Sequence, residues 1–99
     1  NVNFDGSTAG SPSIRSSFNV SSVTEVGTTP KRYTINFISP MATQNYTVSI
    51  CAADVGVNDA GGVHSSIINN SMLTTSITIA RYDWYGNNPS SPVICVNVF

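Results

Sequence analysis

Hydrophobic and polar residues alternate along most of this chain, which is the pattern of strands that bury one face. The alternation is clearest in 33–37, 46–51, 73–79 and 94–98, where aliphatic, β-branched or aromatic residues occupy every second position. No segment has the spacing of an amphipathic helix. The pattern therefore predicts an all-β fold.

A first long strand is predicted over 14–20, with the even-numbered positions on one face. Val23 falls in the opposite phase, and one extra residue at Ser21–Ser22, a β-bulge, would account for the change. Residues 27–31 have the composition of a turn. The strands on either side of this turn, 14–26 and 33–37, should form an antiparallel hairpin.

Two long irregular segments interrupt the strand pattern. The first is 54–70, in which a short strand is predicted around Val63–Ile68, and the second is 81–91. Pro92 opens the last strand. The elements predict a small antiparallel β-sandwich of five to seven short strands, Ig-like or jelly-roll-like, in a single all-β domain that spans 1–99.

The composition narrows the possible partners. Charged residues make up only 9% of the chain and the net charge is −1, whereas nucleic-acid binding needs clustered Lys and Arg to displace counterions from phosphates. No apolar run approaches the length of about 18 residues that spans a bilayer. We therefore expect neither nucleic-acid binding nor membrane insertion. Because the chain begins at Asn1 rather than Met, we expect a processed product or a part of something longer.

Five segments together carry a family resemblance. Residues 2–6 are similar to the pattern V-N-F-x-G, 14–24 to I-R-x-S-[FY]-N-V-S-S-[IV]-T, and 33–37 to Y-T-V-x-F. Residues 41–48 keep the spacing of M-x-x-x-N-Y-x-V, and 95–99 match a closing [VS]-V-x-V-F strand. In these segments the chain resembles the C-terminal β domain of tailed-bacteriophage tail-fibre proteins.

The resemblance implies a viral structural protein, located in the virion on a tail fibre or another external appendage and assembled in the cytoplasm of the bacterial host. It implies a homotrimer that contacts other virion fibre or appendage proteins and acts as a receptor-binding module for host adhesion, on a host surface glycan or protein. No catalytic residue carries over from the family, so a non-catalytic role is expected. A capsid or virion decoration domain that contacts only other virion proteins is the alternative.

Residues 54–70 and 81–88 of the two irregular segments are the predicted recognition surface, because loops can vary without disturbing a core. Aromatic faces can stack on sugar rings, and Asp and Asn side chains can bond hydroxyl groups. A structural role for Trp84, as a lid on the core or against a neighbouring subunit, is the alternative. The proposed ligand-binding residues are Asn58, Asp59, Tyr82, Asp83, Trp84, Tyr85, Asn87 and Asn88.

Other chemistry is less well supported by the sequence. His64 is the single histidine, and nothing in the sequence assembles a Ser-His-Asp triad around it. Asp54, Asn58 and Asp59 could offer oxygen ligands to calcium, but their spacing is not that of an EF-hand. No metal and no cofactor are expected.

The two cysteines, Cys51 and Cys95, do not form a zinc-binding pattern. A disulfide between them is possible if their strands are neighbours. Assembly in a reducing cytoplasm favours two free thiols instead, because disulfides rarely persist there.

Overall fold

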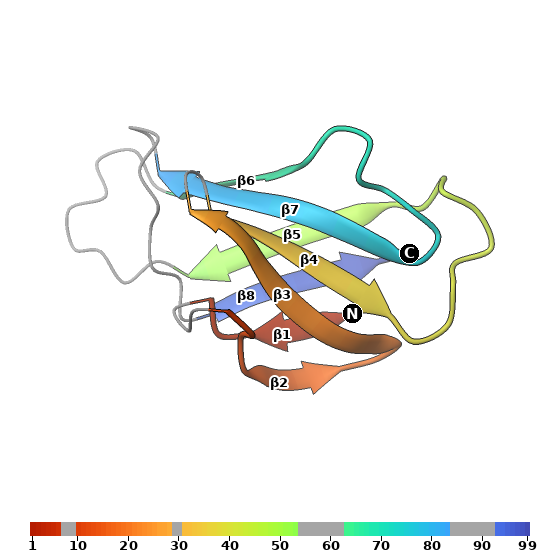
Figure 1. The fold of residues 1–99 in the computed structure, drawn as a ribbon, viewed down its shortest axis with the longest axis horizontal. Helices are drawn as coiled ribbons and strands as arrows, with labels where there is room; N and C mark the ends of the chain where they lie inside the picture. Colours follow the sequence, from red (N-terminus) through yellow and green to blue (C-terminus); the bar gives the residue numbers. More distant parts are fainter. Residues whose placement is uncertain (7–9, 29–30, 54–62, 84–92) are drawn as a thin grey trace.

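The computed structural model describes residues 1–6, 10–28, 31–53, 63–83 and 93–99 (Figure 1). Within these residues the backbone forms eight strands, and no helix long and apolar enough to cross a membrane is present. The strands are β1 (Val2–Phe4), β2 (Ile14–Ser17), β3 (Val20–Thr28), β4 (Lys31–Phe37), β5 (Val48–Ala53), β6 (Val63–Ile67), β7 (Ser76–Asp83) and β8 (Val93–Val98).

The strands form two four-stranded antiparallel sheets that face each other (Figure 1). Sheet A has the order β2-β1-β8-β5, and sheet B has the order β3-β4-β7-β6. This arrangement confirms the predicted antiparallel β-sandwich. The strand count exceeds the expected five to seven because Val2–Phe4 also pairs, with β2 on one side and β8 on the other, and because 14–26 contributes two strands rather than one.

The core lies between the central strands of the two sheets. Its fully buried members alternate along those strands, as the hydrophobic pattern predicted. Sheet A contributes Phe4, Ile94 and Val96, and sheet B contributes Tyr33, Ile35, Ile77 and Ile79.

Tyr33 joins the two sheets through both parts of its side chain. Its ring meets Phe4 edge-on, with centroids 5.2 Å apart. Its hydroxyl donates a hydrogen bond of 2.7 Å to the carbonyl oxygen of Gly6, a buried residue that follows β1. A buried phenol needs such a partner, since an unpaired polar group in the core is costly.

The prediction of one strand over 14–20 is wrong. The chain bends at Phe18 and Asn19, so that β2 belongs to sheet A and β3 to sheet B. Asn19 has a φ of 57°, a left-handed conformation that Asn tolerates better than most residues. Its side-chain amide donates to the Ser39 carbonyl and its Oδ1 accepts from the Ser39 N–H, which fixes the bend.

The predicted bulge and hairpin are confirmed. The register of β3 against β4 shifts between Val20 and Ser22, and the two strands pair antiparallel from there to Lys31. The predicted short strand around 63–68 is confirmed as β6.

Residues 81–83 were expected to be irregular, but they continue β7. Arg81 pairs with Lys31 of β4 on one side, and all three residues pair with 63–65 of β6 on the other. This backbone pairing outweighs the polar character of the residues.

Replacing Tyr33 by Phe tests the link between the sheets. The Gly6 carbonyl would stay buried without its donor, so Tyr33→Phe should lower the free energy of unfolding by about 1–3 kcal/mol. Urea denaturation should show a lower midpoint with an unchanged slope. Thr24→Ala, at an exposed position of β3, is the control and should change stability by less than about 0.5 kcal/mol. Equal stability of Tyr33→Phe and the unmodified chain would contradict this account.

Candidate functional site

Most of the residues predicted to bind a receptor lie outside the described part of the chain. These are Asn58, Asp59, Trp84, Tyr85, Asn87 and Asn88. Tyr82 and Asp83 were predicted to lie in a loop, but their backbone belongs to β7 and pairs with His64 and Val63 of β6. In the described residues, the predicted segment 54–70 therefore contains β6, and the predicted segment 81–91 contains the last three residues of β7.

The strand ends that flank the two segments lie at one end of the sandwich (Figure 1). Ala53 at the end of β5 pairs with Val93 at the start of β8. Val63 at the start of β6 pairs with Asp83 at the end of β7. These four strand ends therefore lie at the same end of the sandwich, and the role of the two segments in recognition remains a prediction.

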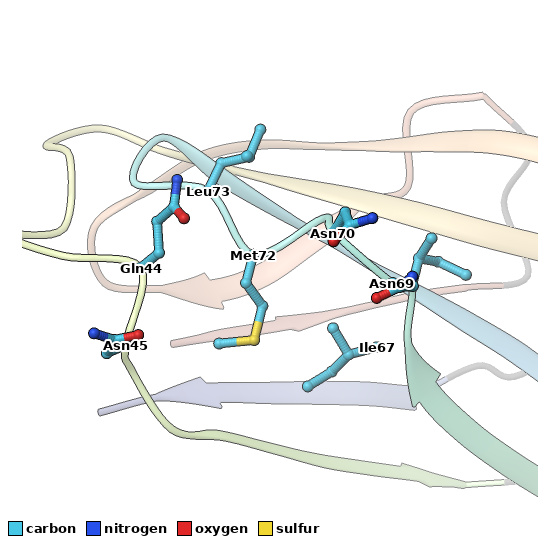
Figure 2. Close-up of a pocket in the computed structure, with 8 residues that line it drawn as sticks. Gln44, Asn45, Ile67, Asn69, Asn70, Met72 and Leu73 are labelled. Atoms are coloured by element: carbon cyan, nitrogen blue, oxygen red, sulfur yellow. The ribbon is translucent and has the colours of Figure 1, made fainter.

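A cleft of ≈ 540 Å³ lies between the segment that precedes β5 and the turn that follows β6. Figure 2 shows Gln44 and Asn45 on one side, Asn69 and Asn70 on the turn, and the Met72 side chain directed into the space between them. The lining residues are Gln44, Asn45, Ile67, Ile68, Asn69, Asn70, Met72 and Leu73.

The turn that forms one wall of the cleft is firmly held. The Ser71 N–H donates to the Ile68 carbonyl at 3.1 Å, which closes a β-turn with Asn70 as its third residue. Asn70 has a φ of 61°, as the third position of a type II turn requires. The Ser71 hydroxyl donates to the Thr78 carbonyl and accepts from the Thr78 N–H, so the turn is tied to β7.

Tyr46 holds the same wall of the cleft in place. Its side chain is buried, and its hydroxyl donates to the carbonyl oxygens of Leu73 at 2.8 Å and Ser76 at 3.3 Å. Its ring packs edge-on against Phe37, with centroids 6.0 Å apart. Burial raises the pKa of the Tyr46 phenol above its usual value. The hydroxyl thus stays protonated and holds the backbone that carries Met72 and Leu73.

The chemistry of the cleft is polar and uncharged. Its rim carries four exposed carboxamides, each of which offers donors and an acceptor, and none bonds to another described residue. The apolar part comes from Ile67, Ile68, Met72 and Leu73. No lining residue has a charge. Such a surface can bind a neutral ligand that has both hydroxyl groups and an apolar face.

The cleft itself was not predicted from the sequence, although Asn69 and Asn70 lie at the end of the predicted recognition segment 54–70. Gln44-Asn45 and Asn69-Asn70 are adjacent pairs of carboxamides next to strand boundaries, and this pairing was the available signal. The pairs are about 25 residues apart in sequence, and only the fold brings them together. In the described residues, no three His, Cys, Asp or Glu side chains gather into a possible metal site.

Comparison with family models, with curated proteins and with solved structures finds no match to this chain. The cleft is therefore interpreted from its own geometry.

Tyr46 predicts a specific behaviour in alkaline solution. Because the pKa of its phenol is raised in the folded state, the protonated form is stabilised there. This contribution is fully present below the unfolded pKa of about 10 and is lost as the pH rises through the higher folded value. The free energy of unfolding should therefore fall more steeply above pH about 10 in the unmodified chain than in Tyr46→Phe.

The comparison is made by urea denaturation at neutral and alkaline pH. At neutral pH Tyr46→Phe should be less stable by about 1 kcal/mol, because a hydrogen bond to Leu73 is lost. This difference should shrink at alkaline pH. Parallel stability curves for the two proteins would show that Tyr46 does not titrate as described.

Proposed function

We propose that this chain is a non-catalytic attachment domain of a bacteriophage appendage, and that it binds a neutral carbohydrate of the host surface in the Gln44–Leu73 cleft. The observation that carries the proposal is the set of four carboxamides and four apolar side chains that line this cleft. The resemblance of 2–6, 14–24, 33–37 and 41–48 to tail-fibre terminal domains supports the virion location. Assembly would take place in the cytoplasm of the bacterial host.

The cleft suits a sugar in three respects. Its carboxamides can donate to and accept from hydroxyl groups, which are themselves donors and acceptors. Its apolar lining residues can cover the C–H face of a sugar ring and exclude water. Its volume of ≈ 540 Å³ falls within the range of about 300–1,000 Å³ that is usual for small-ligand sites. The absence of charge in the lining favours a neutral glycan over an acidic one.

We further propose that the domain assembles as a homotrimer through an apolar end formed by Phe18, Ile38 and Phe99. These side chains are 77%, 67% and 74% exposed. The Ile38 N–H bonds to the Asn19 carbonyl, next to Phe18. Phe18 also lines a hollow of ≈ 160 Å³ together with Val98, the neighbour of Phe99. Exposed aromatic side chains of this kind are enriched at protein interfaces.

Replacing Asn70 by Gly tests the cleft as the binding site. Glycine keeps the positive φ of the turn and removes one carboxamide. We expect binding to an immobilised panel of neutral bacterial polysaccharides to weaken by about tenfold, because sugar hydroxyls would lose a partner. The matched control is Asn97→Ser, which removes a carboxamide at a position that does not line the cleft.

If the irregular segments predicted from the sequence bind the receptor instead, the opposite outcome is expected. If Trp84→Ala abolishes binding in a folded domain while Asn70→Gly leaves it unchanged, recognition lies in the segment 81–88 rather than in the cleft. If none of the glycans binds and the domain adheres only to other virion proteins, the decoration role replaces the attachment role.

Replacing Phe18 by Ser tests the apolar end. Because Phe18 is mostly exposed, the substitution should leave the fold intact and shift the domain from trimer to monomer in sedimentation analysis. Val26→Ser, which alters an apolar residue that is 40% exposed on β3, is the control and should keep the trimer. A monomeric unmodified chain, or a trimeric Phe18→Ser variant, would contradict this interface.

A further inference from the structure

Two cysteines lie directly opposite each other on neighbouring strands. Cys51 of β5 pairs in register with Cys95 of β8, and both are free. Ile94 and Val96 of β8 point into the core, so the alternation places Cys95 on the outer face of sheet A. Cys51 is exposed there and Cys95 is half-buried. The two thiols therefore share one accessible patch of surface.

The hydrogen bonds of the ladder define the type of pair that the cysteines form. Thr47 and Phe99 exchange both backbone hydrogen bonds, at 2.9 and 3.1 Å. Pair types alternate along an antiparallel ladder, so Cys51 and Cys95, four residues further on in β5, again form a hydrogen-bonded pair. The Cα atoms of such a pair are about 5.5 Å apart, which lies inside the range of about 4.4–6.8 Å found in disulfides.

A disulfide at this position would be strained. Facing Cβ atoms in a sheet are about 4.5–5.5 Å apart, with hydrogen-bonded pairs at the longer end of this range, whereas a disulfide brings them to about 3.5–4.5 Å. Closing the bond must therefore draw the two strands together locally. β5 is the terminal strand of sheet A among the described strands, so it can move toward β8 without breaking a second ladder. A bond formed under this strain is more readily reduced than a relaxed one.

We propose that Cys51 and Cys95 form a reversible thiol–disulfide site on the outer face of sheet A, open under reducing conditions and closed by a disulfide oxidant such as glutathione disulfide. This site is independent of the proposed carbohydrate cleft.

The closing reaction has two exchange steps. The more exposed Cys51, as thiolate, attacks one sulfur of glutathione disulfide, whose S–S bond breaks, and the first glutathione leaves and takes up a proton. Cys95, as thiolate, then attacks the sulfur of Cys51, and the second glutathione leaves with a second proton. The two protein thiols lose two electrons and two protons in all, and glutathione disulfide is reduced to two molecules of glutathione.

Closure would link the terminal strand β5 covalently to the central strand β8. Without this bond, β5 is held in sheet A by backbone hydrogen bonds to β8 on one side only. A crosslink between residues 51 and 95 also restricts the unfolded chain. The oxidised domain should therefore unfold at a higher temperature than the reduced one.

The test uses the whole chain, first reduced and then incubated with glutathione disulfide. After acid quenching, the protein is denatured and alkylated, and its intact mass is measured by mass spectrometry. We expect a monomeric chain that has lost two hydrogen atoms, carries no glutathione and takes up no alkylating reagent. Cys95→Ser should stop at the mixed disulfide and keep one glutathione on Cys51, because the second thiol is missing. Reduced glutathione added to the folded oxidised protein should reopen the bond.

Three results would overturn the proposal. The first is that the chain without substitutions keeps glutathione on one or both cysteines. The second is that the disulfide joins two chains. The third is an internal disulfide that reduced glutathione opens only after the domain is unfolded. Each of these results is measured on the chain without substitutions, so the outcome does not depend on the folding of a variant.

Discussion

The Tyr33 side chain is the contact on which the arrangement of the two sheets depends. Its ring packs on Phe4 of sheet A, and its hydroxyl bonds to the carbonyl of Gly6, so one residue of sheet B fixes both the spacing and the relative position of the layers. A ring alone could slide over apolar neighbours at little cost, whereas a buried hydrogen bond has one satisfactory geometry. The isoleucines around it then fill the space between the layers.

Tyr46 makes the same kind of contact as Tyr33 in another part of the domain. Both phenols are buried and donate to backbone carbonyls, Tyr33 to Gly6 after β1 and Tyr46 to Leu73 and to Ser76 at the start of β7. In each case the hydroxyl of a buried tyrosine holds backbone next to the end of a strand. The carboxamide cleft depends on this support, because the segment that Tyr46 holds carries Met72 and Leu73.

The alternation of residue types was sufficient to predict most strands and their buried faces. It failed over 14–18, where Ile14 and Phe18 have the spacing of core residues but are exposed, because alternation does not tell which sheet a strand will join. It also failed at 81–83, where the ladder partners rather than the residue types decide the structure. The cleft could not be predicted, since its two walls are distant in sequence and share no motif. The thiol pair required knowledge of the register, which a single sequence does not reveal.

The pairing of β1 with β8 has a consequence for the order in which the domain can fold. Val2 lies opposite Val96, so the centre of sheet A joins residues from the two extremes of the described chain. During synthesis, sheet B can form from residues 20–83 while β1 still lacks its partner strand β8. Contacts of such high sequence separation form slowly, because the closure of a long loop precedes any gain from them. The core must therefore remain open to solvent on one side until the last strand has left the ribosome, and the nascent domain is most exposed to aggregation during that interval.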